Sequence, residues 1–361
     1  MTLGLTAERG YQMFASYCKY QLNFRFTAIT SRDRMRKKDT YFIKIWDSDP
    51  SRFGIGEAAM FKGLSCDDIP GYEDKLREVC AEIDRYASHP ELLNEYPSIK
   101  MGVETAVNDL KNGCHRLIFP SEWSEGKSSI TINGLVWMGD KELMAERIND
   151  KVKAGFHCIK LKVGGINFND ELDLLRLVRE ICPDVELRLD ANGAFTPENA
   201  MERLTELSAF DIHSIEQPVR QGQWKVMGEL CRKSPIPIAL DEELIGLNSG
   251  ELKREMLDAI RPQYIILKPT LCGGFHGSDE WIALAEERMI GWWATSALES
   301  NIGLNAIAQW VSTKHSTLPQ GLGTGQLYFN NIDSPLNLRG ENLWYDRNAE
   351  WKIPDLEWIE C

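Results

Sequence analysis

The sequence predicts an α/β protein in which a barrel of eight parallel strands follows a smaller α+β domain. From about residue 130, short β-branched and apolar runs recur every 24 to 29 residues, and the segments between them carry apolar residues at three- and four-residue steps. These are the periods of repeated strand and helix units. The first 125 residues show a different order, with alternating strand patterns followed by helical ones. A length of 361 residues suits one large and one small domain.

The first part of the chain, residues 1–125, is expected to form the α+β domain. Its predicted strands are LNFRFTAIT (22–30), TYFIKIW (40–46) and FGIGEA (53–58), and helical spacing follows near 71–87 and 98–112. The basic run SRDRMRKKD (31–39) lies between the first two strands. We interpret this run as a solvated hairpin loop, the usual place for such charges, in preference to a lid over a ligand.

The barrel is assigned to residues 126–325. The eight predicted strands are SSITINGLVW near 132, CIKLKV near 160, ELRLDAN near 188, SIEQP near 215, IPIALDE near 239, YIILKP near 266, GWWATSALES near 295 and QGLGTG near 322. Their spacing is what a strand, a helix and two short loops require. An open doubly wound sheet is the alternative, but the sequence has no phosphate-binding glycine turn after an early strand. The irregular, aromatic stretch 326–361 is expected to return to the first domain.

Composition and charge limit the classes of partner. The formal charge of −13 and the pI near 5.1 produce a field that repels phosphate backbones and anionic lipid, so nucleic acid and membrane surfaces are not expected partners. No apolar run approaches the roughly 18 residues that cross a bilayer, and the first residues lack the order of a signal peptide. We therefore expect a cytoplasmic protein that acts on a small molecule. Assembly into a homo-oligomer is left open.

Charged residues stand at the C-terminal ends of five consecutive predicted strands. They are Lys160 and Lys162, then Asp190, Glu216, Asp241 and Lys268. In a parallel barrel these strand ends meet at one mouth, where active sites lie. The two lysines nearest each other in the sequence are two residues apart, so their side chains point to the same face of a strand. We expect all six side chains to converge there.

A divalent cation would explain the three acids. Carboxylates from three neighbouring strands repel one another in a poorly solvated mouth unless a cation neutralises them. Ligation by carboxylate oxygens favours Mg²⁺ or Mn²⁺, whereas zinc would be expected with His or Cys. Each acid could instead form an ion pair with a neighbouring lysine, which is the ordinary outcome for a single residue. Repetition at one strand position in three consecutive units favours the metal.

The lysines then acquire a chemical role. An ammonium group beside a second ammonium group and a dication loses its proton more easily and can act as a base near neutrality. A carboxylate held by the metal has an acidic α-proton, and a lysine can stabilise the enediolate that its removal produces. The residues therefore predict an enzyme that removes a proton next to the carboxylate of a small molecule.

These residues lie in motifs that resemble those of the enolase superfamily, in its muconate-lactonising subgroup. The motifs are KLK (160–162), LRLDANGAF (187–195), IEQP (215–218), LDEE (240–243) and ILKP (266–269), and the resemblance spans nearly the whole chain. It implies a (β/α)7β TIM-like barrel with an N-terminal α+β capping domain that the C-terminal tail completes. It also implies that Asp190, Glu216 and Asp241 bind Mg²⁺, that Lys162 is the acid/base with Lys160 as its partner, and that Lys268 stabilises the enediolate.

The last strands carry information on the reaction. Dipeptide epimerases of the subgroup have an Asp-x-Asp after the eighth strand, whereas GLGTGQLYFNN (321–331) has no acid. INGLVWMG (132–139), TSALESNIGL (295–304) and GLGTGQLYF (321–329) resemble o-succinylbenzoate synthases. That resemblance implies dehydration of 2-succinyl-6-hydroxy-2,4-cyclohexadiene-1-carboxylate in menaquinone biosynthesis. Racemisation of N-acylamino acids or epimerisation of dipeptides is the alternative, because a lysine on each face suits two-base chemistry.

Candidate substrate contacts are named on the same segments. Ser296, Glu299, Ser300 and Asn301 are candidates for carboxylate or carbonyl contacts, and Gly323, Thr324 and Gly325 would allow close approach of the backbone. Arg188 resembles a residue seen in the family, and a structural ion pair explains it equally well. Gly56, Met60 and Phe61 resemble the capping-domain loop that closes the mouth.

Overall fold

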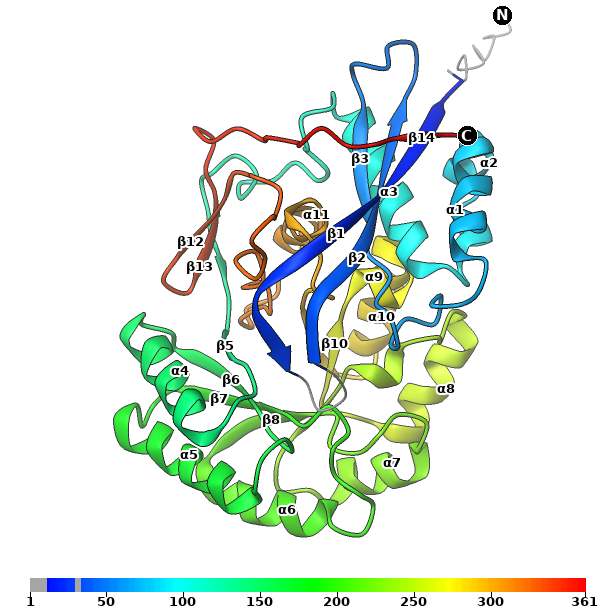
Figure 1. The fold of residues 1–361 in the computed structure, drawn as a ribbon. Helices are drawn as coiled ribbons and strands as arrows, with labels where there is room; N and C mark the ends of the chain where they lie inside the picture. The colour runs from blue at the N-terminus through cyan, green and yellow to red at the C-terminus, as the bar shows by residue number, and fades with distance from the viewer. Residues whose placement is uncertain (1–11, 30–33) are drawn as a thin grey trace, which may run out of the picture.

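The computed structural model describes residues 12–29 and 34–361 and contains an antiparallel sheet, a parallel sheet and a small third sheet (Figure 1). The antiparallel sheet has the order β14-β1-β2-β3. Its strands are β1 (Phe14–Ile29), β2 (Arg34–Trp46), β3 (Gly54–Ala58) and β14 (Ile359–Glu360), and the helices α1 (Tyr72–Ala81), α2 (Ile83–Ser88) and α3 (Pro97–Lys111) follow β3. This is the capping unit that the sequence predicts.

The capping unit is held together by one face of β2 and by α3. Tyr41, Ile43 and Ile45 alternate along the strand, so all three side chains enter one apolar core. Gly56 lets β3 lie directly against α3, because a Cβ atom at this position would come within 1.9 Å of the carbonyl oxygen of Gly102. This close approach fixes the end of β3 that leads to the pocket.

The parallel sheet has the order β11-β10-β9-β8-β7-β6-β5, and its helices lie outside the strands (Figure 1). The strands are β5 (Gly134–Val136), β6 (Cys158–Lys162), β7 (Glu186–Asp190), β8 (Ile212–Glu216), β9 (Ile238–Leu240), β10 (Tyr264–Leu267) and β11 (Gly291–Ala294). The helices are α4 (Lys141–Lys153), α5 (Phe168–Ile181), α6 (Ala200–Leu207), α7 (Trp224–Lys233), α8 (Gly250–Ile260), α9 (Pro269–Cys272), α10 (Gly274–Glu286) and α11 (Asn301–Ser312). The predicted alternation of strands and helices is confirmed.

The first and last predicted barrel strands differ from the expectation. The first run divides into β4 (Ile130–Thr131) and β5, and β4 joins β12 (Leu336–Arg339) and β13 (Asn342–Tyr345) in the third sheet. The run near 322 forms only single bridges, from Gln320 to Ile132 and from Gly321 to Thr295. These bridges still join both ends of the parallel sheet. The segment around Gln320 and Gly321 thus forms the seam of the barrel, where the two outer strands of the parallel sheet are joined. The alternating glycines of GLGTG do not favour a regular strand at this seam.

The predicted loop SRDRMRKKD is wrong for most of its length. Residues 34–39 belong to β2, where Lys38 lies opposite Leu22 and Lys37 opposite Asn23. Residues 31–33 lie outside the described part of the chain. Arg34, Arg36 and Lys37 are exposed on this strand, whereas Lys38 is buried and Met35 lines the cavity described below, so the charge run does not mark a loop here.

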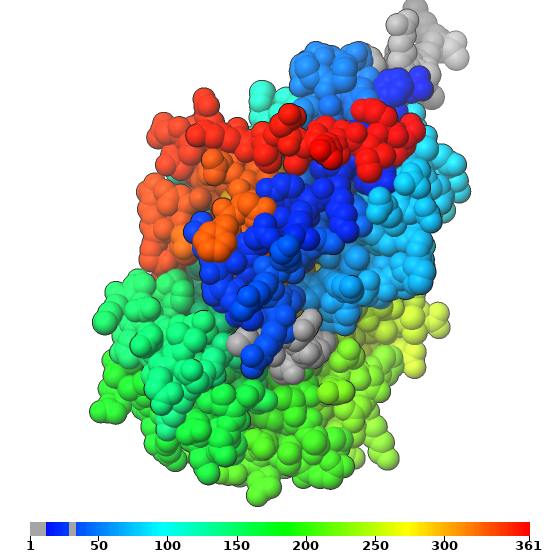
Figure 2. Space-filling model, viewed as in Figure 1, coloured from blue at the N-terminus to red at the C-terminus, as the bar shows by residue number. Residues whose placement is uncertain are grey.

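The C-terminal segment returns to the first sheet, as predicted. Glu360 and Ile359 pair with Ser16 and Tyr17, and the segment lies across the capping sheet in Figure 2. At its other end β1 packs on the barrel mouth, where Phe24 and Trp137 share an apolar cluster. The division between residues 125 and 126 stays a prediction. Within the described residues, no helix is long and apolar enough to span a bilayer.

Candidate active site

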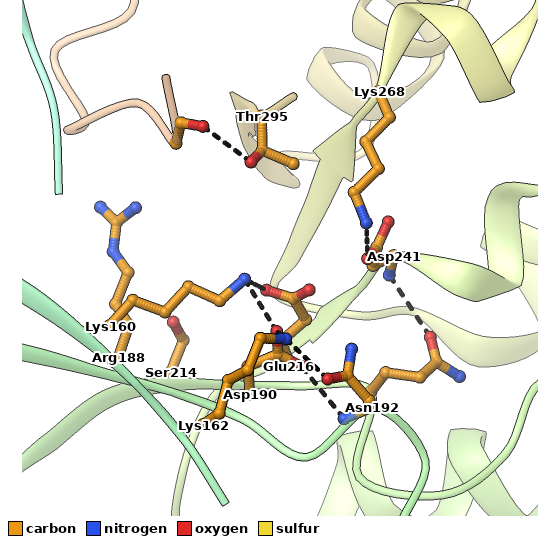
Figure 3. A network of polar contacts seen from close by, with 12 residues as sticks. Lys160, Lys162, Arg188, Asp190, Asn192, Ser214, Glu216, Asp241, Lys268 and Thr295 are labelled. Carbon is orange, nitrogen blue, oxygen red and sulfur yellow. Dashed lines mark hydrogen bonds and ion pairs between the residues drawn. The ribbon is translucent and has the colours of Figure 1, made fainter. Parts of the chain in front are cut away.

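The six charged residues predicted from the strand ends converge at the carboxyl ends of the parallel strands (Figure 3). Lys160 and Lys162 lie on β6, Asp190 and Glu216 end β7 and β8, and Asp241 and Lys268 directly follow β9 and β10. All except Asp241 line one cavity of about 280 Å³. The prediction that these strand ends share one mouth is confirmed.

Ion pairs connect the lysines with the acids between them. Lys162 Nζ lies 2.9 Å from Asp190 Oδ2, and Lys160 Nζ lies 3.0 Å from the same oxygen. Lys160 also pairs with Glu216, and Lys268 pairs with Asp241. Figure 3 shows the two lysines of β6 on one side of the carboxylates and Lys268 on the other. A small molecule above the carboxylates would therefore have an amine on each side.

Burial makes the charge of this cluster costly. Burial alone would raise the pKa of Asp190, but the ammonium groups of Lys160 and Lys162 hold this pKa well below its usual range. Burial and the neighbouring carboxylate of Asp190 raise the pKa of Glu216 well above its usual range. Burial would lower the pKa of Lys160, yet Asp190 and Glu216 raise it. The two lysines thus stabilise the negative charge of Asp190, whereas the charge of Glu216 is disfavoured.

The donor set fits a hard divalent cation, but its oxygens are turned toward the lysines. Glu216 Oε1 is buried and has no hydrogen-bond partner, which leaves one carboxylate oxygen free for a further ligand. Three carboxylates on adjacent strands supply the oxygen ligands that Mg²⁺ prefers. In the part of the chain that the structure describes, no group of three His, Cys, Asp or Glu residues is already arranged to hold an ion. An ion would need the carboxylates to turn from Lys160 and Lys268.

The walls of the cavity are mostly apolar. Met35 and Phe61 come from the capping unit, Leu135 from β5, and Trp137 and Leu298 from loops at the barrel mouth. Lys162 Nζ lies 5.9 Å from the centre of the Trp137 ring. Such walls exclude water from the amine and strengthen electrostatic interactions near it.

The capping-loop prediction holds for one residue of three. Phe61 lines the cavity, whereas Met60 and Gly56 do not. Met60 instead packs against the core of the capping unit.

Three of the predicted substrate contacts lie at the cavity. Ser296, Gly323 and Thr324 are part of its lining, whereas Arg188, Glu299, Ser300 and Asn301 are not. The Ser296 hydroxyl donates to Glu299 Oε2 at 2.5 Å. A side chain at Gly323 would meet Ile132 at 3.1 Å, so glycine keeps this wall open.

The other predicted substrate contacts form hydrogen bonds within the protein instead. Arg188 is 1% exposed, donates to Glu186 and to the carbonyl of Pro319, and lies 4.2 Å from the Trp293 ring centre. Glu299 accepts hydrogen bonds from Thr270 and Ser296, Ser300 donates to Glu57, and Asn301 donates to the carbonyl of Ile332. Because none of these four residues lines the cavity and each forms hydrogen bonds within the protein, the predicted substrate contacts are not kept for Arg188, Glu299, Ser300 and Asn301.

Several residues of the cavity were not singled out from the sequence, and Asn192 is the one that contacts Lys162. Asn192 accepts a hydrogen bond from Lys162 at 2.7 Å and donates to Glu242 at 3.1 Å. Its place in the LRLDANGAF motif, two residues after Asp190, was a usable signal. Asn133, Trp137 and Lys62 also line the cavity. The first two lie in INGLVWMG, whereas Lys62 has no sequence signal beyond its place after Phe61.

Comparisons with known proteins agree with this geometry. The family model described as "Enolase C-terminal domain-like" matches residues 143–342. An o-succinylbenzoate synthase of Desulfotalea psychrophila is 44% identical over 91% of this chain and 98% of its own length. The crystal structure of MenC from the same organism has a TM-score of 0.80 at 42% identity, covering 92% of this chain and 99% of that chain.

More distant structures share the fold. A dipeptide epimerase of Enterococcus faecalis, solved with Mg and the dipeptide L-Leu-L-Tyr, has a TM-score of 0.80 at 18% identity and covers 94% of this chain and 97% of that chain. At this identity the likeness is evidence of the fold alone. The family model and the D. psychrophila synthase carry the assignment. The chain belongs to the enolase superfamily and, within it, to the o-succinylbenzoate synthase family.

Proposed function

We propose that the protein is a metal-dependent hydro-lyase that converts 2-succinyl-6-hydroxy-2,4-cyclohexadiene-1-carboxylate to o-succinylbenzoate, a step of menaquinone biosynthesis. The observation that carries this proposal is the arrangement of the cavity, with Lys162 and Lys268 on opposite sides of Asp190 and Glu216. The 44% identity with the D. psychrophila synthase supports the choice of substrate. The absence of an Asp-x-Asp motif after the eighth predicted strand further favours dehydration over dipeptide epimerisation.

Lys162 is the proposed acid/base. Its neutral amine removes the proton next to the substrate carboxylate, and the same ammonium group then donates a proton to the hydroxyl that departs as water. The C–H and C–O bonds break on the same face of the ring, and the ring becomes aromatic. Asn192 accepts from Lys162 Nζ and so orients the amine. Lys160, which bridges Asp190 and Glu216, is its proposed partner.

Lys268 is the proposed stabiliser of the negative charge that develops on the carboxylate oxygens. It lies across the cavity from Lys162, and its present partner is Asp241. A fixed ammonium group in a poorly solvated site stabilises an enediolate without reorganisation of solvent. Lys268 is thus expected to act through its charge, without proton transfer.

Asp190, Glu216 and Asp241 are the proposed ligands of Mg²⁺ or Mn²⁺. The unpartnered Glu216 Oε1 and its raised pKa both fit a site that gains a cation. When bound, the ion would withdraw charge from the substrate carboxylate and make the neighbouring proton more acidic. The Mg in the E. faecalis epimerase of the same fold supports the choice of ion.

The test is turnover of the diene acid by the purified protein with and without Mg²⁺. The proposal predicts loss of diene absorbance, appearance of o-succinylbenzoate, and loss of both after chelation. The alternative is an N-acylamino acid racemase or dipeptide epimerase, which the amine on each side of the cavity favours. Incubation with N-acylamino acids in heavy water that gives α-deuteration and racemisation, with no dehydration of the diene acid, would establish that alternative.

The location and the oligomeric state of the protein remain to be measured. A cytoplasmic location is expected from the sequence alone, and assembly into a homo-oligomer is left open. Sedimentation of the purified protein and fractionation of cells would measure them.

A further inference from the structure

Two buried polar side chains at the barrel seam have no hydrogen-bond partner. Asn133 is 4% exposed and Thr324 is 5% exposed, and neither Asn133 Oδ1 nor Thr324 Oγ1 forms a hydrogen bond. An unpaired buried polar atom costs roughly 1–3 kcal/mol. Both residues line the same cavity as the catalytic lysines. Unpaired groups in such a wall are expected where a ligand supplies the missing partner.

The two residues are neighbours although they lie far apart in the sequence. The backbone N–H of Asn133 donates to the carbonyl of Gln320 at 2.9 Å, and Ile132 forms a bridge to Gln320. A Cβ atom on Gly323 would lie 3.9 Å from the Asn133 carbonyl oxygen. The segment with Thr324 therefore runs beside the start of β5 and closes the barrel between β5 and β11.

The seam lies across the barrel from the carboxylates. In the strand order β11-β10-β9-β8-β7-β6-β5 the acids occupy the ends of the central strands β7, β8 and β9. The seam joins the two outer strands. A substrate whose carboxylate lies over Asp190 and Glu216 therefore extends its other substituent toward the seam.

The group that the seam would bind is neutral and accepts hydrogen bonds. The Thr324 hydroxyl can donate a hydrogen bond, and Asn133 can donate through Nδ2 when its amide turns over and places Nδ2 where the unpaired Oδ1 lies. Neither carries charge, so a carboxylate buried here would lack a counter-ion. The terminal carboxylate of the acyl chain has a better partner in Lys62, a cavity residue with no ion pair among the described residues.

We propose that Asn133 and Thr324 together hydrogen-bond the keto oxygen of the substrate's acyl chain and so fix the ring over Lys162. This assignment rests on the proposed function, because it takes the acyl ketone of the diene acid as the ligand. It makes the seam a specificity site for acyl compounds. A carboxylic acid with a methylene group in place of the ketone would leave both side chains unpaired.

Binding of two product analogues separates the ketone contact from all other contacts. The Mg²⁺-loaded protein would be titrated calorimetrically with o-succinylbenzoate and with 4-(2-carboxyphenyl)butanoate, in which a methylene replaces the ketone. The wild type is expected to prefer the ketone by about ten-fold, the worth of one or two neutral hydrogen bonds. Thr324→Val, alone and with Asn133→Leu, is expected to reduce this preference progressively to none.

Thermal unfolding of the same variants tests whether the two residues are merely structural. Both replacements remove an unpaired buried group and keep its approximate volume, so the melting temperature should stay or rise. Thr295→Val is the matched control: its hydroxyl lines the same cavity but already donates to the Gly321 carbonyl at 2.9 Å. This control should lose stability and keep the ketone preference.

The outcomes distinguish this assignment from the proposed function. If the wild type dehydrates the diene acid but Thr324→Val and the double variant keep the full ketone preference, the seam assignment is wrong and the function stands. A bound water at the seam would give that same result. If the wild type neither dehydrates the diene acid nor binds o-succinylbenzoate, both the proposed function and the seam assignment are overturned.

Discussion

Ser300 at the start of α11 donates two hydrogen bonds to Glu57 of β3, one from its backbone N–H at 2.9 Å and one from its hydroxyl at 2.6 Å. Glu57 is 1% exposed and also accepts from the Thr40 hydroxyl and the Gly303 N–H. The carboxylate thus satisfies the N-terminus of a barrel helix from within the capping unit. This contact fixes the capping unit over the mouth.

We predict that Glu57→Ala lowers the free energy of unfolding by about 3 kcal/mol, because it leaves several buried donors without an acceptor. Ser300→Ala should cost about 1 kcal/mol, since it removes the hydroxyl and keeps the backbone hydrogen bond. Urea unfolding of both variants measures these changes. Equal stability of Glu57→Ala and the wild type would show that the contact does not stabilise the fold.

Asp190→Asn is predicted to weaken Mg²⁺ binding by roughly a hundred-fold or more, because loss of an outer-shell partner alone costs 10–100-fold. The neutral amide also removes the charge that Lys160 and Lys162 now share. Isothermal titration with Mg²⁺ measures the affinity. Asp184→Asn, at an exposed position before β7, is the matched control and should bind as the wild type does. Equal affinity in Asp190→Asn would remove this residue from the ligand set.

Glu104 is predicted to make stability depend on pH. Its carboxylate accepts from the Phe275 N–H at the start of α10, and burial raises the pKa of Glu104 to about 7 although Lys100 opposes the change and Asp279 adds to it. The usual value is about 4.3. The folded state therefore binds this proton more tightly, and the stability it contributes at low pH is lost as pH rises through about 7.

Thermal unfolding between pH 5 and pH 8 tests this expectation. The wild type should lose more stability over this interval than Glu104→Gln, whose amide stays neutral. Parallel curves for the two proteins would show that Glu104 does not titrate in this range.

The strand ends could be predicted from the sequence, whereas the loop contacts could not. Lys162 and Asp190 terminate strands of regular spacing, and the geometry of a parallel barrel then brings them together. Ser300 follows a strand in the same way, but its partner Glu57 lies 243 residues earlier in another sheet. No local pattern indicates such a partner, so Ser300 was predicted to face the substrate.

The sequence also did not reveal the surroundings of Arg188 and Asn133. Arg188 was predicted to contact the substrate and does not line the cavity, whereas Asn133 was not predicted and does. Arg188 lies two residues before Asp190 and faces the barrel interior. Its guanidinium group donates to the carbonyl of Pro319 and lies over the ring of Trp293, so it is not free to bind a substrate. Asn133 lies at a seam that the glycine-rich segment closes through single bridges, so its burial without a partner becomes visible only in three dimensions.

In the proposed reaction Lys162 moves the proton. The most direct measurement is turnover of 2-succinyl-6-hydroxy-2,4-cyclohexadiene-1-carboxylate, with saturating Mg²⁺, by the wild type, Lys162→Ala and the exposed-lysine control Lys153→Ala. We predict that Lys162→Ala loses at least about a thousand-fold in kcat while it still binds Mg²⁺ and o-succinylbenzoate, since positioned acid/base groups contribute 10²–10⁴-fold. The control should turn over as the wild type does. Dehydration by Lys162→Ala at the wild-type rate would contradict the acid/base role of Lys162.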